Sequence, residues 1–344
     1  MNHKYTFLFT YFLLFFVSLM TFGQDEYLHF NSKCKDSVSP FTKVNVIDKR
    51  STEQTLGFVQ IGGFNRIARV KFTGNLPDSL AAFFKNSDST KMDGSELAIS
   101  LYELYLSEKE EGFTETGRLK LCMRIFEKTR EGNFAECYAI DSIYKFQAID
   151  VTVKLMNSVS EHLCEISQSL IISRNDTFLS SKRYTYEELI NLDSIEKLEI
   201  PIYTTTKYKC GIFANYDQFK MNLPETSIIE IDTSNCKNIK VYKYDSGKTN
   251  RTRLDNHSCY AVSDGNIVLK ATAIGFYKLE KINSDFYFDG QTSFSNANNV
   301  AMWTLAAGMI GAAVASGAER NYQRFRFKIN YRKGNSVLIS KAID

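Results

Sequence analysis

One stretch of strict alternation, residues 117–126, most constrains the fold of this chain. Apolar side chains at the odd positions from 119 to 125 alternate with arginine, lysine and cysteine at the even positions. Side chains of a β-strand point alternately to its two faces, so this strand is expected to bury one face and wet the other. Residues 136–146 are its expected antiparallel neighbour across a polar turn at 130–133. The alternation therefore predicts an antiparallel sheet with one apolar face that other elements must cover.

Two helical patterns can cover that face. The first begins at Leu76-Pro77, where proline suits the first helical turn. The second follows Asp150, a suitable N-cap, and its apolar residues recur at spacings of three and four from Leu155 to Leu170. With the β-type runs, the order from residue 66 onward is strand, helix, three strands, helix, which predicts an α/β two-layer sandwich. The other β-type runs are residues 44–47, 56–61, 66–72 and 97–106.

The first 23 residues have the pattern of a secretory signal peptide. His3 and Lys4 precede an apolar run at residues 7–20, and Thr21-Phe22-Gly23 places small residues at the two positions that a signal peptidase reads. The alternative is an uncleaved anchor, which needs about 20 apolar residues. The residue directly after the expected cut is Gln24 and the next cysteine is Cys34, so we expect no lipid anchor. We expect an exported protein that is periplasmic or associated with the outer membrane.

The remaining chain is longer than one hydrophobic core usually organises, which predicts two domains. A polar break at residues 173–177 separates an α/β sandwich at 24–173 from a β-rich domain at 184–344, giving the α+β class. In the second domain we expect a short helix at 186–191 and a terminal hairpin that turns at 332–335. A small antiparallel sheet is expected from the runs 197–203, 227–231, 240–244, 259–262, 267–271, 275–278 and 286–288.

Composition excludes some classes of protein and names no ligand. A hydrophobic content of 44% and only 4 prolines argue against disorder, and a net charge of +3 does not indicate nucleic acid as a partner. The 7 cysteines form no CxxC pair, so a thiolate metal site is not expected. Cys122 and Cys137 lie on neighbouring expected strands, so they either form a disulfide or stay buried free thiols.

We find no catalytic constellation and expect no cofactor. Asp255, His257 and Cys259 form a local cluster that alternation would place on one side of a strand. No Cys/His signature surrounds them, and the rim of a hairpin explains them more simply than a nucleophilic or metal site. The charge run at residues 108–111 is expected to solvate the end of a strand.

The element order of the N-terminal half resembles a family of periplasmic auxiliary lipoproteins that accompany envelope transporters. The residues that carry the resemblance are Leu-x-Ile-x-Leu-x-Glu-Leu at 97–104 and the helix after Asp150-Val151-Thr152. The resemblance implies a binding or assembly component without catalytic residues. The expected absence of a lipid-anchor cysteine departs from the family's pattern.

Residues 211–219 with Asn222-Leu223-Pro224, and later residues 260–265, are similar to a pattern in uncharacterised secreted proteins of Bacteroidetes-type bacteria. Phe213 stands where that pattern has an aromatic residue. The likeness covers residues 184–344 and implies secretion without a mechanism. The same segments also fit structural roles as a helical turn and a hairpin turn.

Residues 300–318 carry no charge and are rich in alanine and glycine. Small residues recur every four positions, the spacing that lets helix backbones approach closely. The alternatives are burial in the β-rich domain, contact with another envelope protein or a second copy, and membrane contact. The candidate contact residues are Ala307, Gly308, Gly311, Ala312, Ala315 and Ser316.

These patterns favour a secreted cell-envelope protein with a binding or assembly role and no catalysis. The alternative is a hydrolase acting on envelope polymers, which would require an acid or nucleophile pair that the spacing does not show.

Export predicts a defined mature N-terminus. Mass spectrometry of the protein from an envelope fraction should find a first residue near Gln24, because the apolar run ends at Thr21-Phe22-Gly23. Recovery of intact Met1 from that fraction would contradict the expectation.

Overall fold

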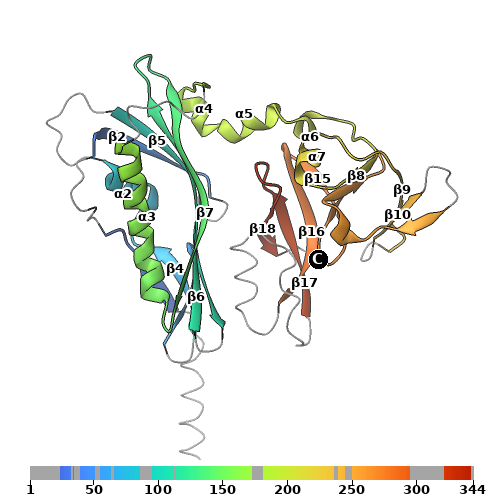
Figure 1. The fold of residues 1–344 in the computed structure, drawn as a ribbon, viewed down its shortest axis with the longest axis horizontal. Helices are drawn as coiled ribbons and strands as arrows, with labels where there is room; N and C mark the ends of the chain where they lie inside the picture. Colours follow the sequence, from blue (N-terminus) through green and yellow to red (C-terminus); the bar gives the residue numbers. More distant parts are fainter. Residues whose placement is uncertain are drawn as a thin grey trace, which may run out of the picture.

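The computed structural model has an α+β fold, which confirms the expected class (Figure 1). The expected signal peptide at 1–23 and the small-residue segment at 300–318, with all six candidate contact positions, lie outside the described residues. The structure describes residues 24–31, 34, 39–50, 55–62, 66–85, 95–111, 114–172, 181–235, 239–244, 250–294 and 321–341.

The N-terminal half is built on a mixed seven-stranded sheet. Its centre is a meander of three long antiparallel strands, β5 (Ser95–Glu111), β6 (Thr114–Lys128) and β7 (Phe134–Ala148). The strand expected at 117–126 and its antiparallel neighbour are therefore confirmed. The shorter strands are β1 (Gln24–Leu28), β2 (Phe41–Asp48), β3 (Gly57–Ile61) and β4 (Arg66–Phe72); β1 pairs with β4, and β2 and β3 pair with β5, in parallel.

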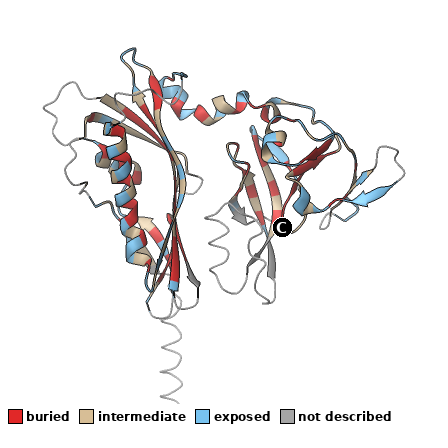
Figure 2. Ribbon diagram, viewed as in Figure 1, coloured by how far each residue is buried: buried red, intermediate tan, exposed pale blue. Residues whose placement is uncertain are grey.

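Two helices cover one face of this sheet, as expected. The first, α2 (Leu76–Phe84), begins at Asn75, whose side chain accepts a hydrogen bond from the backbone N–H of Asp78. The second, α3 (Thr152–Ile172), turns its apolar stripe to the sheet (Figure 2). The residues that α3 contributes to the core are Leu155, Val159, Leu163, Ile166 and Leu170.

Cys122 and Cys137 do not form the disulfide that was one of the two alternatives for them. Cys34 forms a disulfide with Cys164 of α3, whereas Cys122 and Cys137 are free. The reason is register: Cys122 of β6 lies opposite Asp141 of β7, far along the strand from Cys137. Free, half-buried thiols, the second alternative, are confirmed for both residues.

The C-terminal half consists of short helices and three small antiparallel sheets among the described residues. The terminal hairpin is confirmed, but the strand expected at 197–203 is wrong. That segment holds the end of α5 and the start of α6, where Pro201 suits the first helical turn and the helix buries Ile202 and Tyr203. The helices are α4 (Tyr186–Ile190), α5 (Leu192–Leu198), α6 (Pro201–Thr204) and α7 (Tyr216–Lys220).

Two of the three small sheets contribute to an aromatic core that includes Phe213, Phe219, Phe286 and Phe288, whereas Ile229 and Val241 of the remaining sheet belong to a separate apolar cluster. The first sheet holds β9 (Ile228–Asp232), β10 (Lys240–Tyr244) and β11 (Arg251–Arg253). The second holds β8 (Gly211–Phe213), β12 (Ala261–Ser263), β13 (Val268–Ala271) and β14 (Phe276–Lys278). The third holds β15 (Glu280–Ile282), β16 (Asp285–Phe294), β17 (Asn321–Ile329) and β18 (Ser336–Lys341).

The expectation that residues 108–111 solvate the end of a strand is wrong for Glu108, which is 0% exposed. Its carboxylate accepts hydrogen bonds from the backbone N–H of Gln60 at 2.6 Å and from the hydroxyl of Thr152 at 3.1 Å. Burial raises the pKa of Glu108 to about 7, and the nearby charges of Glu115 and Asp150 act in the same direction. The carboxyl group thus joins β3 to the start of α3.

A substitution at Glu108 should change how stability depends on pH. The folded protein keeps the proton on Glu108 up to about pH 7, whereas a glutamate in the unfolded chain releases it near pH 4.3. The contribution of Glu108 to the unfolding free energy is therefore fully present below about pH 4.3 and is lost as the pH rises to about 7. We expect Glu108→Gln, relative to wild type, to gain about 3 kcal/mol of unfolding free energy between pH 4 and pH 8. Urea unfolding at both pH values measures this gain, with the exposed Glu131→Gln as control. A difference that does not change with pH would contradict it.

Candidate binding cleft

The second face of the long meander contacts the C-terminal half. Connecting helices α4 and α5 pack Leu189 and Leu192 against Phe126 and Phe134 of the sheet. The turn between β17 and β18 contacts the same face through Arg332 and Lys333. This face, expected to be wet, is therefore partly covered: Lys120, in the middle of β6, is 8% exposed. A polar junction between the two halves results.

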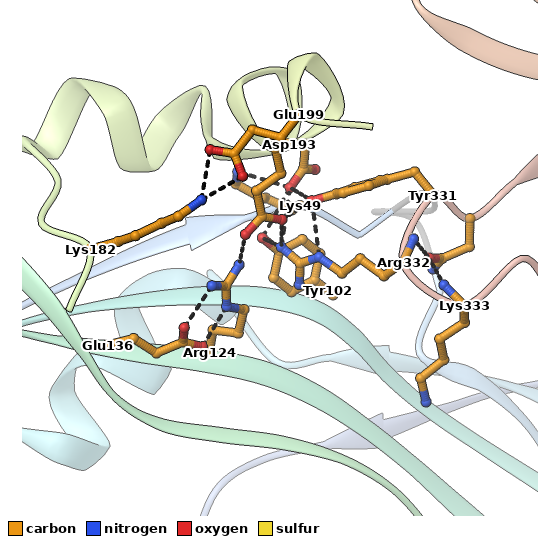
Figure 3. Close-up of polar contacts among 12 residues, drawn as sticks. Lys49, Tyr102, Arg124, Glu136, Lys182, Asp193, Glu199, Tyr331, Arg332 and Lys333 are labelled. Carbon is orange, nitrogen blue, oxygen red and sulfur yellow. Dashed lines mark hydrogen bonds and ion pairs between the residues drawn. The ribbon is translucent and has the colours of Figure 1, made fainter. Parts of the chain in front are cut away.

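Arg332 lies at the centre of this junction (Figure 3). Its guanidinium donates to the hydroxyl of Tyr102 at 2.5 Å and lies 3.9 Å from the centre of that ring. It also contacts Glu196 at 3.2 Å and Asp193 at 3.5 Å, two acidic residues of α5. One side chain of the terminal turn thereby connects a strand of the N-terminal sheet to the linking helix.

The acidic residues of α5 are held in their charged form. Burial alone would raise the pKa of Asp193, but the charges of Lys49 and Arg332 outweigh it and lower the pKa. The pKa of Glu196 is lowered in the same way, by Arg332 and by the hydroxyl of Tyr331. That hydroxyl carries one hydrogen and lies within hydrogen-bond distance of both acids, 2.5 Å from Glu196 and 3.0 Å from Asp193. Both carboxylates therefore stay ionised at neutral pH.

Arg124 of β6 makes the second link between the sheet and α5. It binds both carboxylate oxygens of Glu136, at 2.5 and 2.7 Å (Figure 3). It also contacts Glu196 at 2.6 Å. Bidentate arginine–carboxylate pairs fix geometry as well as charge. Arg124 and Arg332 thus meet at one acidic residue, Glu196, from opposite sides of the junction.

Three neighbouring strands bring Glu103, Cys122 and Asp141 together in cross-strand register. One ligand atom of each lies within 4.8 Å of the others, the spacing of a possible metal site. The ammonium of Lys120 pairs with Asp141 and lies 3.6 Å from Glu103, so a cation of the protein itself already contacts both carboxylates. Burial and the two acids raise the pKa of Cys122 to about 12, which keeps it a thiol. We assign no metal here.

A cavity of about 630 Å³ opens beside this network. Ligand pockets commonly span about 300 to 1,000 Å³. Its walls come from both halves of the chain: Arg124 and Asp141 from the sheet, Lys182 and Glu199 from the connection, and Lys220 from α7. A second cavity of about 270 Å³ adjoins it and shares Cys122, Asp141, Tyr331 and Arg332. We refer to the two together as the cleft.

The cluster of Asp255, His257 and Cys259 does not line the cleft, and its geometry does not form a site. Asp255 caps a short 3-10 helix at Asn256–Ser258, and its carboxylate accepts from the backbone N–H of His257 at 3.0 Å. The three residues therefore do not share one side of a strand. Asp255 and His257 are exposed, and burial raises the pKa of Cys259 to about 11.

Sequence reasoning missed the residues of the cleft. The alternation of Arg118, Lys120, Cys122 and Arg124 predicts a wet face, although three positive charges on one strand also fit a surface that contacts another part of the protein. No alternation of charged and apolar residues surrounds Asp193 and Glu196, so the sequence does not single them out. The sequence predicts the position of Arg332 in the terminal turn. Its contact with Tyr102 of β5 depends on the tertiary structure.

Comparisons with known proteins identify no family. No family model matches the chain, and no curated protein matches it. One solved structure, described as an uncharacterized protein, is 9% identical over 44% of this chain and 98% of its own, with a TM-score of 0.25. A similarity this low carries no argument. Among the described residues, no helix is long and apolar enough to cross a membrane.

Removing Arg332 should weaken the junction. Arg332→Ala leaves Asp193 and Glu196 with fewer counter-charges in a mostly buried setting, and we expect a loss of about 2 to 3 kcal/mol of unfolding free energy. The neighbouring Lys333→Ala removes a more exposed ion pair with Asp141 and should cost less than about 1 kcal/mol. Urea unfolding compares the two variants. Equal losses would show that Arg332 does not hold the junction.

Proposed function

We propose that this protein is an exported cell-envelope protein that binds a polar ligand in the cleft and does not catalyse a reaction. The observation that carries the proposal is the cavity of about 630 Å³ whose walls come from both halves of the chain. Pockets at the junction of two parts of a protein are common ligand sites. Binding there would engage both halves at once.

Export is supported by two independent observations. The first 23 residues have the pattern of a signal peptide. The disulfide between Cys34 and Cys164 is of the kind that persists in oxidising compartments such as the bacterial periplasm. It joins residues 130 positions apart, so it would also stabilise the N-terminal half.

The charges of the cleft favour a polar ligand that carries an anionic group. Arg124, Arg332 and Lys182 each have carboxylate partners. Half-buried Lys220 makes no ion pair with another residue that the structure describes, although it lines the cavity. An anionic group of a ligand would supply the missing partner. We propose fragments of envelope polymers as the ligand class.

A hydrolase acting on envelope polymers is the second candidate, and one pair of residues favours it. Glu103 and Asp141 lie within 4.8 Å of each other at the edge of the cleft. Burial raises the pKa of Glu103; for Asp141, burial is outweighed by hydrogen bonds and charges from Lys120 and Lys333, and the pKa is lowered. An acid and an ionised carboxylate side by side are the equipment of many glycosidases. We favour binding because Asp141 is already paired with two lysines.

Charge reversal at Lys220 tests the binding proposal. Using soluble peptidoglycan fragments as the probe, we expect Lys220→Glu to weaken binding by about tenfold or more, since one charge-assisted hydrogen bond contributes about 1.5 to 3 kcal/mol. Isothermal titration calorimetry measures the loss, and Lys278→Glu, an exposed position on β14, is the matched control.

Two outcomes count against this proposal. Equal binding by both variants would remove Lys220 from the site. Breakdown of the fragments by wild type that is lost in Glu103→Gln would favour the hydrolase.

A further inference from the structure

The strand β7 forms one edge of the seven-stranded sheet and is unusually long for an edge. Its partner on one side is β6 along its whole length. On the other side, the described residues supply one bridge, between Phe134 and Tyr184 at the start of the strand. Edge strands with free backbone groups are templates for pairing with another strand, and proteins usually shorten them or interrupt them with proline. β7 has 15 residues and no proline.

The side chains beyond this bridge alternate strictly in exposure. The odd positions from 139 to 147 are exposed on the face that carries Asp141, and the even positions are half-buried on the face that carries Tyr144. Ile143 is 42% exposed in the middle of the odd row. This is an apolar side chain flanked at equal distance by one acidic and one basic residue, Asp141 and Lys145.

We propose that β7 pairs with β7 of a second copy of this chain, antiparallel and centred on Ile143. In that register the two Ile143 side chains meet, and each Asp141 lies directly opposite a Lys145. On the other face, Ile140 lies opposite Phe146. Cross-strand pairs of opposite charge and of apolar side chains are the pairs that stabilise antiparallel sheets. The surface is thus complementary to itself, as a two-fold interface requires.

Other registers lose this complementarity. Centring the pair on Asp141 or on Lys145 places like charges opposite each other, which is destabilising. Centring it on Ser142 or Tyr144 leaves neither charge opposite its counterpart. The register at Ile143 is therefore the one that joins the two charges.

Within one copy, the strand pairing gives Lys145 no acidic residue directly opposite it. Within one copy, Lys145 lies directly opposite Arg118 of β6, a like-charge pair. It makes no ion pair with any residue that the structure describes. Asp141 of the second copy would be its neighbour on the free side. Asp141 already binds Lys120 and Lys333, but a carboxylate has about four acceptor positions and can bind a third cation.

Self-association can be measured by size-exclusion chromatography with light scattering on the mature chain. We expect wild type to form a dimer and Lys145→Asp, which places two acidic residues opposite each other, to weaken it by at least about tenfold. Val153→Lys, at an exposed apolar position of α3, is the matched control and should leave the dimer intact. A monomeric wild type, including one that instead binds an extended peptide at this edge, would overturn the proposal.

A cross-linking experiment tests the register. In a Cys210→Ser background, which removes the thiol that is exposed among the described residues, Ile143→Cys should form an intermolecular disulfide because directly opposed residues lie within disulfide range. Lys145→Cys should not, since its counterpart across the interface is Asp141. Non-reducing electrophoresis separates the two results. Equal cross-linking of both variants, or of neither, would overturn the assigned register, and neither result depends on ligand binding in the cleft.

Discussion

The long meander β5–β6–β7 carries apolar side chains on one face and charged side chains on the other, and other parts of the chain pack on both faces. On the apolar face, α2 and α3 bury a continuous core. On the opposite face, burying charged side chains without partners of opposite charge would destabilise the fold more than the packing contacts stabilise it. The chain meets this requirement with acidic residues of α5 and basic residues of the terminal turn. The ion pairs that connect the two halves therefore also neutralise the covered part of this face.

The cleft is a consequence of the same requirement. Long charged side chains such as those of Arg124 and Glu196 bridge the two halves here. The space left beside the pairs is the cavity of about 630 Å³. A ligand entering it meets charges that are already fixed by their partners, which reduces the ordering cost of binding. Lys220 of α7, which also lines the cavity, makes no ion pair with another described residue.

Local sequence patterns predicted the secondary structure correctly where the buried face of an element follows from its own periodicity. The alternation at 117–126 and the apolar stripe after Asp150 led to the correct elements because period two and period three to four are set by backbone geometry. Local patterns failed where burial came from a distant segment. Glu108 looks like part of a solvated charge run, but β3 and the start of α3 close over it. Residues 197–203 look β-like, but Pro201 begins a helix that packs into the aromatic core.

The sequence by itself determined the α+β class, the two-layer order of the N-terminal half and the terminal hairpin, because these depend on side-chain periodicity and turn chemistry within short segments. Only the tertiary structure decided which cysteines pair, where Arg332 binds and which carboxylates stay charged. Each of these depends on atoms more than a hundred residues apart in the chain, such as Tyr102 and Arg332. Local patterns hold no information about such distances, since charge and burial are set by whichever segment folds against them.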